Sequence, residues 1–250
     1  MGRRLELIFP AREIGRLLRR NWALAYRETL APRHFELGGV RLRLDPSWAT
    51  PTVRQHIYAG QYEDQERRII DATLRLGDRV LEVGAGAGYI TTRACQIVGA
   101  ENVTAYEANP AMAAVATETA ALNGFSPAVI NAALGEHDGE TTLHFGAEFW
   151  STSRLPARGA RELRVPMRSF AAELERLAPT YLQIDVEGAE AALLREAKLP
   201  ECVRALTVEL HPQRLAPGEM RAMLASLLEA GFNLDLETTG GLVAFFERTH

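Results

Sequence analysis

The chain has 250 residues, 47% of them hydrophobic and 24% charged, proportions that are ordinary for a globular protein in water. This length suffices for one large α/β domain with an extension, and the sequence contains no apolar run long enough to cross a membrane. Its formal net charge is -4, and its two cysteines, Cys95 and Cys202, match neither a redox nor a zinc-binding spacing. We therefore expect reduced thiols and a cytoplasmic protein without membrane contact.

The first part of the chain is basic. Residues 1–43 contain ten arginines and four glutamates, a charge of +6, so residues 44–250 must carry -10 to give -4. Apolar residues recur at helical spacing over 11–30, which predicts an amphipathic helix that packs on the domain or on a partner subunit. Residues 35–45 predict a short hairpin that turns at Gly38-Gly39. We expect residues 1–56 to form an N-terminal extension that could support a homodimer, and we interpret its arginines as a solvated face because aromatic residues are not interleaved among them.

A second region, residues 57–250, shows alternating strand and helix patterns. It opens with Ile57 to Glu63 and a helix over about 64–76, and the Tyr62-Glu63 pair lies directly before the first predicted sheet strand. The stretch from Val80 to Ile90 reads V-L-E-V-G-A-G-A-G-Y-I, a buried strand followed by a glycine-rich turn and the start of a helix. Glycine lets a ligand approach the backbone, and a helix start offers free N–H groups.

The glycine spacing separates two kinds of nucleotide site. The dinucleotide pattern G-x-G-x-x-G/A would require a small residue where Tyr89 stands, and no P-loop pattern occurs in the sequence. The pattern here is E-x-G-x-G-x-G. Glu107 closes the next predicted strand, 103–107, and lies 21 residues after Gly86. An acidic residue at that distance is placed to accept hydrogen bonds from ribose hydroxyls.

The later elements complete the pattern. A third strand is expected over 127–134, where small residues after Asn131 leave room for an adenine ring, and a β insertion is expected over 136–168 with a polar substrate or lid loop at 149–154. A buried strand then leads into I-D-V-E-G-A-E (184–190), and another, 203–210, ends in V-E-L-H-P (208–212). A helix over 218–230 precedes an antiparallel pair, 232–237 and 242–247. This order predicts a doubly wound, mostly parallel sheet with an antiparallel edge strand.

With these stretches together, the chain resembles the FkbM family of class I S-adenosylmethionine (SAM)-dependent methyltransferases. The matching segments are G-Q-Y-E (60–63), the glycine turn, N-A-A-L-G (131–135), I-D-V-E-G-A-E and V-E-L-H, so the resemblance covers about 57–215. It implies a seven-stranded Rossmann-like methyltransferase sheet. It also implies SAM as the cofactor, S-adenosylhomocysteine as the product, and O-methylation of a small molecule or sugar.

The resemblance and the strand-end positions together give candidate site residues. The expected cofactor-binding residues are Tyr62, Glu63, Glu82, Gly84, Ala85, Gly86, Gly88, Glu107, Ala108, Asn131, Ala132 and Asp185. Expected substrate contacts are Trp150, Ser151 and Glu209. Asp185 and Glu187, like Glu209 and His211, are two residues apart on a strand and share a face. We take His211 as the first choice of catalytic base, because its ordinary pKa is near neutral, and Asp185 or Glu187 as supporting groups.

Several alternatives stay open. His211 could cap a strand end, and Glu187 could be an acid that a helix N-terminus favours. Asp185, Glu187, Glu209 and His211 could also bind a hard divalent ion, but methyl transfer from SAM needs no metal and we expect none. The basic arm suggests an RNA methyltransferase, although an Asn-Pro-Pro-Tyr-type motif is missing. A catalytically silent SAM-fold assembly subunit, docking through residues 11–30, is the third function considered.

Overall fold

The computed structural model describes residues 27, 29–145, 152–153, 161–196 and 198–248. Nearly all of the amphipathic helix predicted at 11–30 lies outside these ranges, and so do the candidate substrate residues Trp150 and Ser151. Within the described ranges, no helix combines the length and the apolar character that crossing a membrane would require.

A seven-stranded sheet forms the centre of the molecule, in the order β12-β13-β11-β10-β3-β4-β5. Its strands are β3 (Val80–Val83), β4 (Val103–Tyr106), β5 (Ala128–Ile130), β10 (Tyr181–Ile184), β11 (Ala205–Glu209), β12 (Phe232–Leu234) and β13 (Val243–Arg248). This arrangement confirms the predicted doubly wound sheet, with the strand leading to Asp185 between the first strand and the one ending at Glu209. The reversed strand is β13, which lies between β11 and β12 and not at the edge itself. A strand that returns directly from β12 must run antiparallel to it, and it inserts into the position next to β11.

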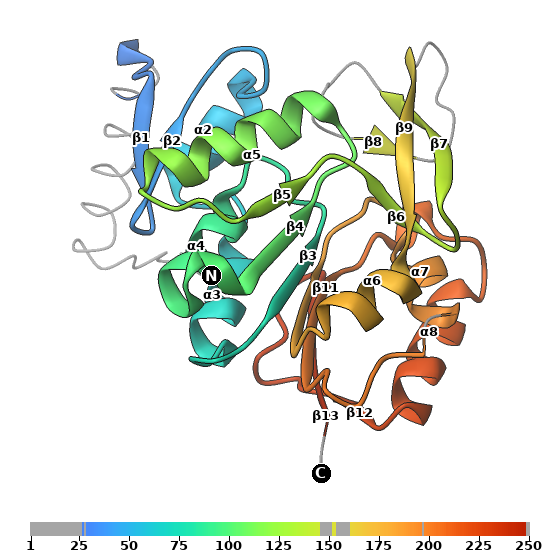
Figure 1. Ribbon diagram of the computed structural model, residues 1–250. Helices are drawn as coiled ribbons and strands as arrows, with labels where there is room; N and C mark the ends of the chain where they lie inside the picture. Colours follow the sequence, from blue (N-terminus) through green and yellow to red (C-terminus); the bar gives the residue numbers. More distant parts are fainter. Residues whose placement is uncertain (1–26, 28, 146–151, 154–160, 197, 249–250) are drawn as a thin grey trace, which may run out of the picture.

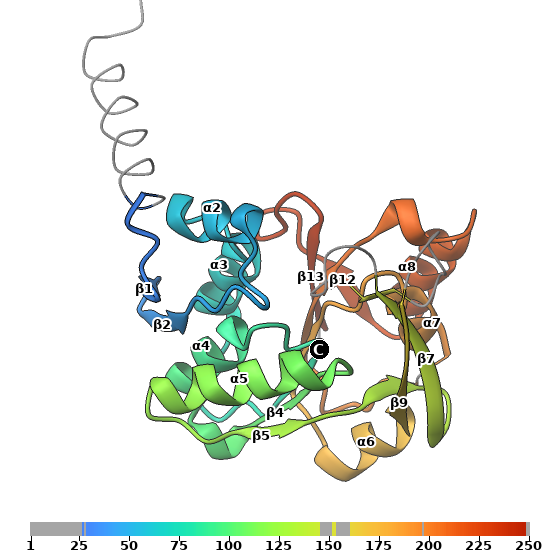
Figure 2. The same ribbon diagram turned by 90° about the horizontal axis from the view of Figure 1, so that it is seen from above.

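Helices cover both faces of this sheet (Figures 1 and 2). They are α2 (Pro51–Ala59), α3 (Asp64–Thr73), α4 (Tyr89–Val98), α5 (Pro110–Leu122), α6 (Phe170–Leu177), α7 (Glu190–Glu196) and α8 (Glu219–Glu229), with short 3-10 turns at Ala100–Asn102 and Pro212–Arg214. Strand residues alternate between two cores: Val80 and Tyr181 pack with α2, α3 and α4, whereas Leu81 and Leu182 pack with α6, α7 and α8. Burial on both faces explains why the central strands lack polar alternation.

The predicted hairpin is present as β1 (His34–Leu37) and β2 (Val40–Arg43), paired antiparallel around Gly38 and Gly39. Val40 and Leu42 are fully buried in the core on the α4 side. Arg43 forms an ion pair with Glu118 of α5. The hairpin is therefore part of the folded domain. The boundary predicted between residues 56 and 57 falls inside α2, which begins after the Thr50 N-cap.

The predicted third strand is wrong in its length. β5 ends at Ile130, and the chain re-enters a strand only at β6 (Ala133–Gly135), which belongs to a separate four-stranded sheet with β9 (Arg161–Ser169), β7 (Gly139–Phe145) and β8 (Thr152–Ser153). Asn131 interrupts the strand because its side-chain Nδ2 donates to the carbonyl oxygens of Glu107 and Ala108, at 2.9 and 3.0 Å. The second sheet corresponds to the predicted β insertion.

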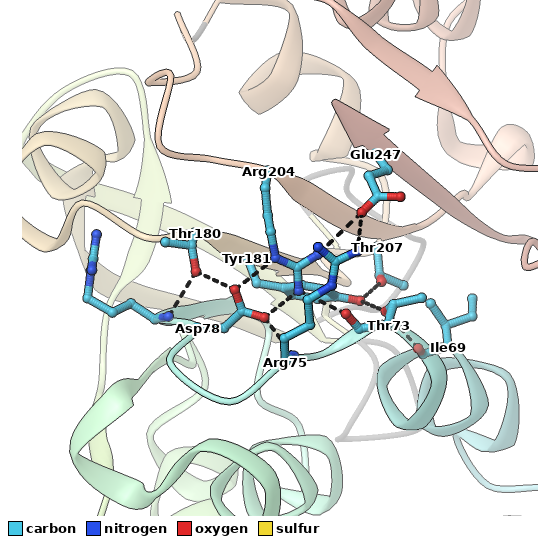
Figure 3. Close-up of polar contacts among 10 residues, drawn as sticks. Ile69, Thr73, Arg75, Asp78, Thr180, Tyr181, Arg204, Thr207 and Glu247 are labelled. Carbon is cyan, nitrogen blue, oxygen red and sulfur yellow. Dashed lines mark hydrogen bonds and ion pairs between the residues drawn. The ribbon is translucent and has the colours of Figure 1, made fainter. Parts of the chain in front are cut away.

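A polar cluster connects the amino ends of β3, β10 and β11, at the edge of the sheet opposite the cavity described below (Figure 3). Arg204 Nε donates to Asp78 Oδ1 at 2.9 Å, and Thr180 Oγ1 donates to the same oxygen at 2.7 Å. Arg204 Nη2 also donates to the carbonyl oxygen of Thr73 at 2.8 Å. Burial alone would raise the pKa of Asp78, but its hydrogen bonds from Arg204, Thr180 and the Arg75 backbone lower it below the ordinary range.

We expect Arg204→Ala to destabilise the protein by about 3–5 kcal/mol, because it leaves the buried Asp78 carboxylate without its cation. Arg75→Ala is a control, since Arg75 pairs with Glu247 at the exposed surface and such pairs contribute about 0–1 kcal/mol. Urea unfolding at neutral pH measures both. The lowered pKa of Asp78 stabilises the folded state at pH values above the ordinary aspartate pKa of about 4, and this contribution is lost as the pH falls further. The difference in unfolding free energy between the parent protein and Arg204→Ala should therefore become smaller in acid. Equal losses in the two variants would contradict this account.

Candidate active site

A cavity of about 570 Å³ opens at the carboxyl ends of the central strands. This edge is where open α/β sheets bind their ligands, and the volume is ordinary for a small-molecule site. Gly84, Glu107 and Asp185 line the cavity and directly follow β3, β4 and β10, and Glu209 lines it at the end of β11. The parallel register of the strands therefore brings together residues that are far apart in the sequence.

The three glycines of the turn after β3 have different roles. A Cβ on Gly84 would lie 1.8 Å from the carbonyl oxygen of Asp185, and a Cβ on Gly88 would lie 2.6 Å from Ala116 Cα. These two glycines allow segments of the protein itself to approach closely. Gly86 has a φ of +52°, and the nearest atom to its Cβ position is Glu63 Oε1, at 3.7 Å. Gly86 alone leaves open space that faces the cavity.

Glu107 is fixed at the cavity wall by backbone donors. Its Oε2 accepts from the N–H of Gly86 at 2.9 Å, and its Oε1 accepts from the N–H of Asn109 at 2.8 Å. Burial raises the pKa of Glu107, while these donors act in the opposite direction. The backbone of Ala108 is a further donor to this carboxylate, and because a carboxylate has about four acceptor positions, one remains for a hydroxyl group in the cavity.

An apolar section of the wall lies beside Glu107. Ala108 and Ala132, both predicted, line it together with Met112, Leu134 and Leu143. The last three were not predicted, because they come from α5, β6 and β7 and only the tertiary structure brings them here. An apolar surface of this kind can pack against the aromatic base of a nucleoside.

An acidic group occupies the opposite part of the cavity. Asp185, Glu187 and Glu209 line it, and His211 lies behind them with only 6% of its surface exposed. His211 Nε2 is 3.8 Å from Asp185 Oδ1, 3.4 Å from Glu187 Oε2 and 3.9 Å from Glu209 Oε2. On its other side, Nδ1 is 3.5 Å from Oε1 of Glu190, which is fully buried. The imidazole is thus surrounded by carboxyl groups and is not among the residues that line the cavity.

These contacts shift the pKa values in a consistent way. Burial, followed by the charges of Glu209 and Glu187, raises the pKa of Asp185 well above its ordinary value. Burial alone would lower the pKa of His211, but its interaction with Glu190 and the charge of Glu187 raise it overall. His211 therefore holds its proton more readily than an exposed histidine, and Asp185 holds a proton more readily than an exposed aspartate.

Two acidic residues of the cavity have a strained backbone. Glu63 and Glu187 have φ values of +45° and +48°, in the left-handed region that side chains other than glycine rarely adopt. Such residues cost about 1–3 kcal/mol each and persist where the surrounding structure holds them. Arg214 Nη2, 3.0 Å from Glu187 Oε2, is one of these restraints.

Residues before the first sheet strand form another part of the wall. Trp48, Val53 and His56 come from the segment leading into α2 and from α2 itself, and Gln65 and Glu66 come from the start of α3. Their positions depend on how α2 and α3 pack over the sheet edge, so no local sequence pattern indicated them. Burial raises the pKa of Glu66 to about 7.

The family model for the methyltransferase FkbM domain matches residues 82–234 of this chain. The chain belongs to this family. The match contains the glycine turn, Glu107 and the acidic group, and SAM is the methyl donor of the family. The resemblance inferred from the sequence is therefore confirmed, and the protein is a SAM-dependent methyltransferase.

Comparison with curated proteins gave no match. Among solved structures, the FkbM chain is similar to precorrin-6y C5,15-methyltransferase from Geobacter metallireducens, with 11% identity over 74% of this chain and 86% of that chain and a TM-score of 0.46. It is similar to a methyltransferase from Pyrococcus furiosus, with 13% identity over 93% and 95% and a TM-score of 0.43. It is also similar to fibrillarin from Aeropyrum pernix in complex with natively bound SAM, with 10% identity over 73% and 73% and a TM-score of 0.40.

The residues of this FkbM domain fit SAM. Gly86 provides a surface that any Cβ would obstruct, and Glu107 offers a free acceptor position beside it. The donor carries a sulfonium and an ammonium group. Seven carboxyl residues line the cavity, and no described lysine or arginine does: Glu63, Asp64, Glu66, Glu107, Asp185, Glu187 and Glu209. A cavity of this charge favours a cationic cofactor.

The predicted site residues divide into three groups. Those that line the cavity are Tyr62, Glu63, Gly84, Gly86, Glu107, Ala108, Ala132, Asp185, Glu187 and Glu209. Those that lie near it without lining it are Glu82, Ala85, Gly88, Asn131 and His211. Glu82 is buried below the turn, where it accepts from Thr91 Oγ1 at 2.5 Å and its pKa is raised to about 8 by burial. Trp150 and Ser151 stay predictions outside the described chain.

Glu107→Ala should weaken SAM binding at least tenfold, because a hydrogen bond to a charged group contributes about 1.5–3 kcal/mol. Calorimetric titration with SAM measures the change. Glu118→Ala is the control, since Glu118 is an exposed acid on α5 that pairs with Arg43 away from the cavity. A thermal melt of each variant separates loss of binding from loss of the backbone contacts of Glu107. An affinity within twofold of the parent protein would show that another residue holds the ribose.

Proposed function

We propose that this FkbM protein transfers the methyl group of SAM to a hydroxyl group of a small molecule or sugar. The observation that carries the proposal is the position of Asp185. Asp185 lines the cavity together with Glu187 and Glu209, and its Oδ1 has no hydrogen-bond partner in the described chain. A carboxylate with a raised pKa is suited to remove a proton from a bound hydroxyl.

Different residues of the chain would bind the donor, orient the acceptor and remove its proton. Gly86 and Glu107 hold the nucleoside part of the donor, and SAM, when bound, supplies an electrophilic methyl group. Asp185 accepts the proton of the acceptor hydroxyl, and Glu187 orients that hydroxyl. Alignment of the two reactants can contribute several orders of magnitude, and a base adds roughly 10²–10⁴-fold.

His211 has a supporting role in this proposal, in place of the base role expected from the sequence. It is buried behind the carboxyl groups and does not line the cavity, and its raised pKa makes the protonated form, which cannot accept a proton, more favourable than in an exposed histidine. An imidazolium 3.8 Å from Asp185 favours the ionised carboxylate that the reaction needs.

RNA methylation is the alternative that the ten arginines of residues 1–43 favour. The acidic lining of the cavity opposes it, because seven carboxyl groups would repel a phosphate backbone. A catalytically silent subunit would bind SAM without transferring its methyl group, so a transfer assay with labelled SAM distinguishes it from an active enzyme.

The proposal is tested with carbon-13-methyl SAM and fractionated cell extract. We expect a labelled small molecule whose methyl chemical shift identifies a methyl ether. Label that is found in nuclease-sensitive material would support the RNA alternative, and label on nitrogen would contradict O-methylation. A protein that binds SAM but labels nothing in any fraction would indicate the silent subunit.

A further inference from the structure

Glu66 is a buried acidic residue without a cationic partner. It lies on α3 with 6% of its surface exposed, and it lines the cavity. No ion pair involving Glu66 occurs within the described residues. Glutamate is almost never buried to this extent unless it is paired, because an isolated charge loses its hydration. A carboxyl group in this position either holds a proton, in agreement with its pKa of about 7, or pairs with a cation that enters the cavity.

Most other acids of the cavity already have partners. Asp64 pairs with Arg67 at 2.7 Å and with Arg68 at 2.8 Å. Glu107 accepts from backbone N–H groups. Glu209 resembles Glu66 more closely, since its nearest cationic atom in the described chain is His211 Nε2, at 3.9 Å. Glu66 and Glu209 both line the cavity, and α3, which carries Glu66, is in contact with β11, which ends at Glu209.

This part of the cavity is far from the nucleoside end. Glu209 ends β11 and Glu107 follows β4, and these strands are separated by β10 and β3 in the sheet. Three strand spacings of about 4.8 Å put the two strand ends roughly 14 Å apart. Asp185 follows β10, between them. If Glu107 holds the ribose and Asp185 lies beside the reacting methyl group, Glu66 and Glu209 lie on the acceptor side.

We propose that Glu66 and Glu209 bind an ammonium group of the acceptor, so that the substrate is an amino alcohol, such as an amino sugar, whose hydroxyl faces Asp185. This inference rests on the proposed function and defines its substrate class. The ammonium would supply the cation that Glu66 lacks, and its distance from Asp185 would select which hydroxyl is methylated. Neutral alcohols of the same shape would leave the two carboxyl groups uncompensated.

The experiment measures binding and does not depend on methyl transfer. The full-length protein is saturated with S-adenosylhomocysteine and titrated with D-glucosamine and ethanolamine, and in parallel with D-glucose and ethylene glycol as neutral counterparts. Ligand-observed NMR gives the dissociation constants. We expect each amine to bind at least tenfold more tightly than its counterpart, as one charge-assisted hydrogen bond would produce.

Variants of the two glutamates test whether they cause the preference for amines. Glu66→Gln and Glu209→Gln keep the side-chain shape and should each reduce the amine preference to less than threefold. Glu118→Gln is the control, because Glu118 is an exposed acid on α5 that pairs with Arg43 and does not line the cavity, so the preference should stay unchanged. SAM affinity within twofold of the parent protein shows that a variant is folded.

The outcomes distinguish a failure of the amino alcohol inference from a failure of the proposed O-methylation. If the parent binds SAM but prefers neither amine, or if the preference survives both glutamine substitutions, the amino alcohol inference is wrong and the methyltransferase proposal stands. If a labelled neutral ether is the product in extract, the inference is also wrong. If label appears only on nitrogen or in RNA, the proposed O-methylation itself fails, whatever the amine titrations show.

Discussion

Gly86→Leu is expected to abolish SAM binding while the protein stays folded. The Cβ position of Gly86 faces the cavity, with Glu63 Oε1 at 3.7 Å as its nearest neighbour, so the new side chain occupies space that the cofactor needs. A ligand and a side chain cannot share this volume, and we expect affinity to fall at least a hundredfold, or about 2.7 kcal/mol. Calorimetric titration with SAM, together with circular dichroism, measures binding and folding separately.

A matched control isolates the backbone strain of this substitution. Gly124 also has a positive φ, +83°, and no atom lies within 4 Å of its Cβ position. It follows α5 and does not line the cavity. Gly124→Leu should therefore lose stability of the same order as Gly86→Leu, about 1–2 kcal/mol, and retain SAM affinity. Unchanged affinity in Gly86→Leu would place the cofactor elsewhere.

The central sheet and its cofactor edge could be predicted from the sequence, because their signals are local. Apolar runs of strand length identified β3, β10 and β11, and the glycines and acids directly after these strands marked the edge where they meet. Asp185, Glu187 and His211 lie beyond the ends of β10 and β11, so these groups converge because the strand ends are neighbours, and not because residues two apart on one strand share a face. Hydrophobic pattern and strand-end chemistry are properties of short segments, so a single sequence reveals them.

The features that were missed depend on tertiary contacts. Asn131 ends β5 early because its side chain bonds backbone oxygens of another loop, which no residue pattern within 127–134 shows. Glu82 precedes the glycine turn as the motif requires, but it faces Thr91 under the turn. Trp48 and His56 reach the cavity only through the packing of the segment before the family match. His211 has the chemistry of a base, but its burial behind three carboxyl groups changes what it can do.

Asp185→Asn should reduce turnover by roughly 10²–10⁴-fold at every pH, the usual contribution of a general base. Asparagine preserves the shape of the side chain and cannot accept the proton. In the parent protein, kcat/KM should rise with pH through the raised pKa of Asp185, because only the ionised carboxylate is active. Turnover is measured with the acceptor that labelled transfer identifies, and SAM affinity is measured alongside it.

His211→Ala distinguishes the two candidate bases. If Asp185 is the base, loss of the imidazolium 3.8 Å away makes the carboxylate harder to ionise, so the rising limb of the pH profile should move to higher pH and turnover should recover in alkaline buffer. If His211 is the base, the limb should disappear and the rate should stay low at all pH values. Glu190 provides a further test, because its Oε1 accepts from the backbone N–H of His211 at 2.8 Å and lies 3.5 Å from Nδ1, while its Oε2 accepts from the N–H of Gly188. Glu190→Gln removes the interaction that raises the pKa of His211 and should reproduce a weaker form of the alkaline shift. An unshifted profile in both variants would show that His211 has no influence on the proton that leaves the acceptor.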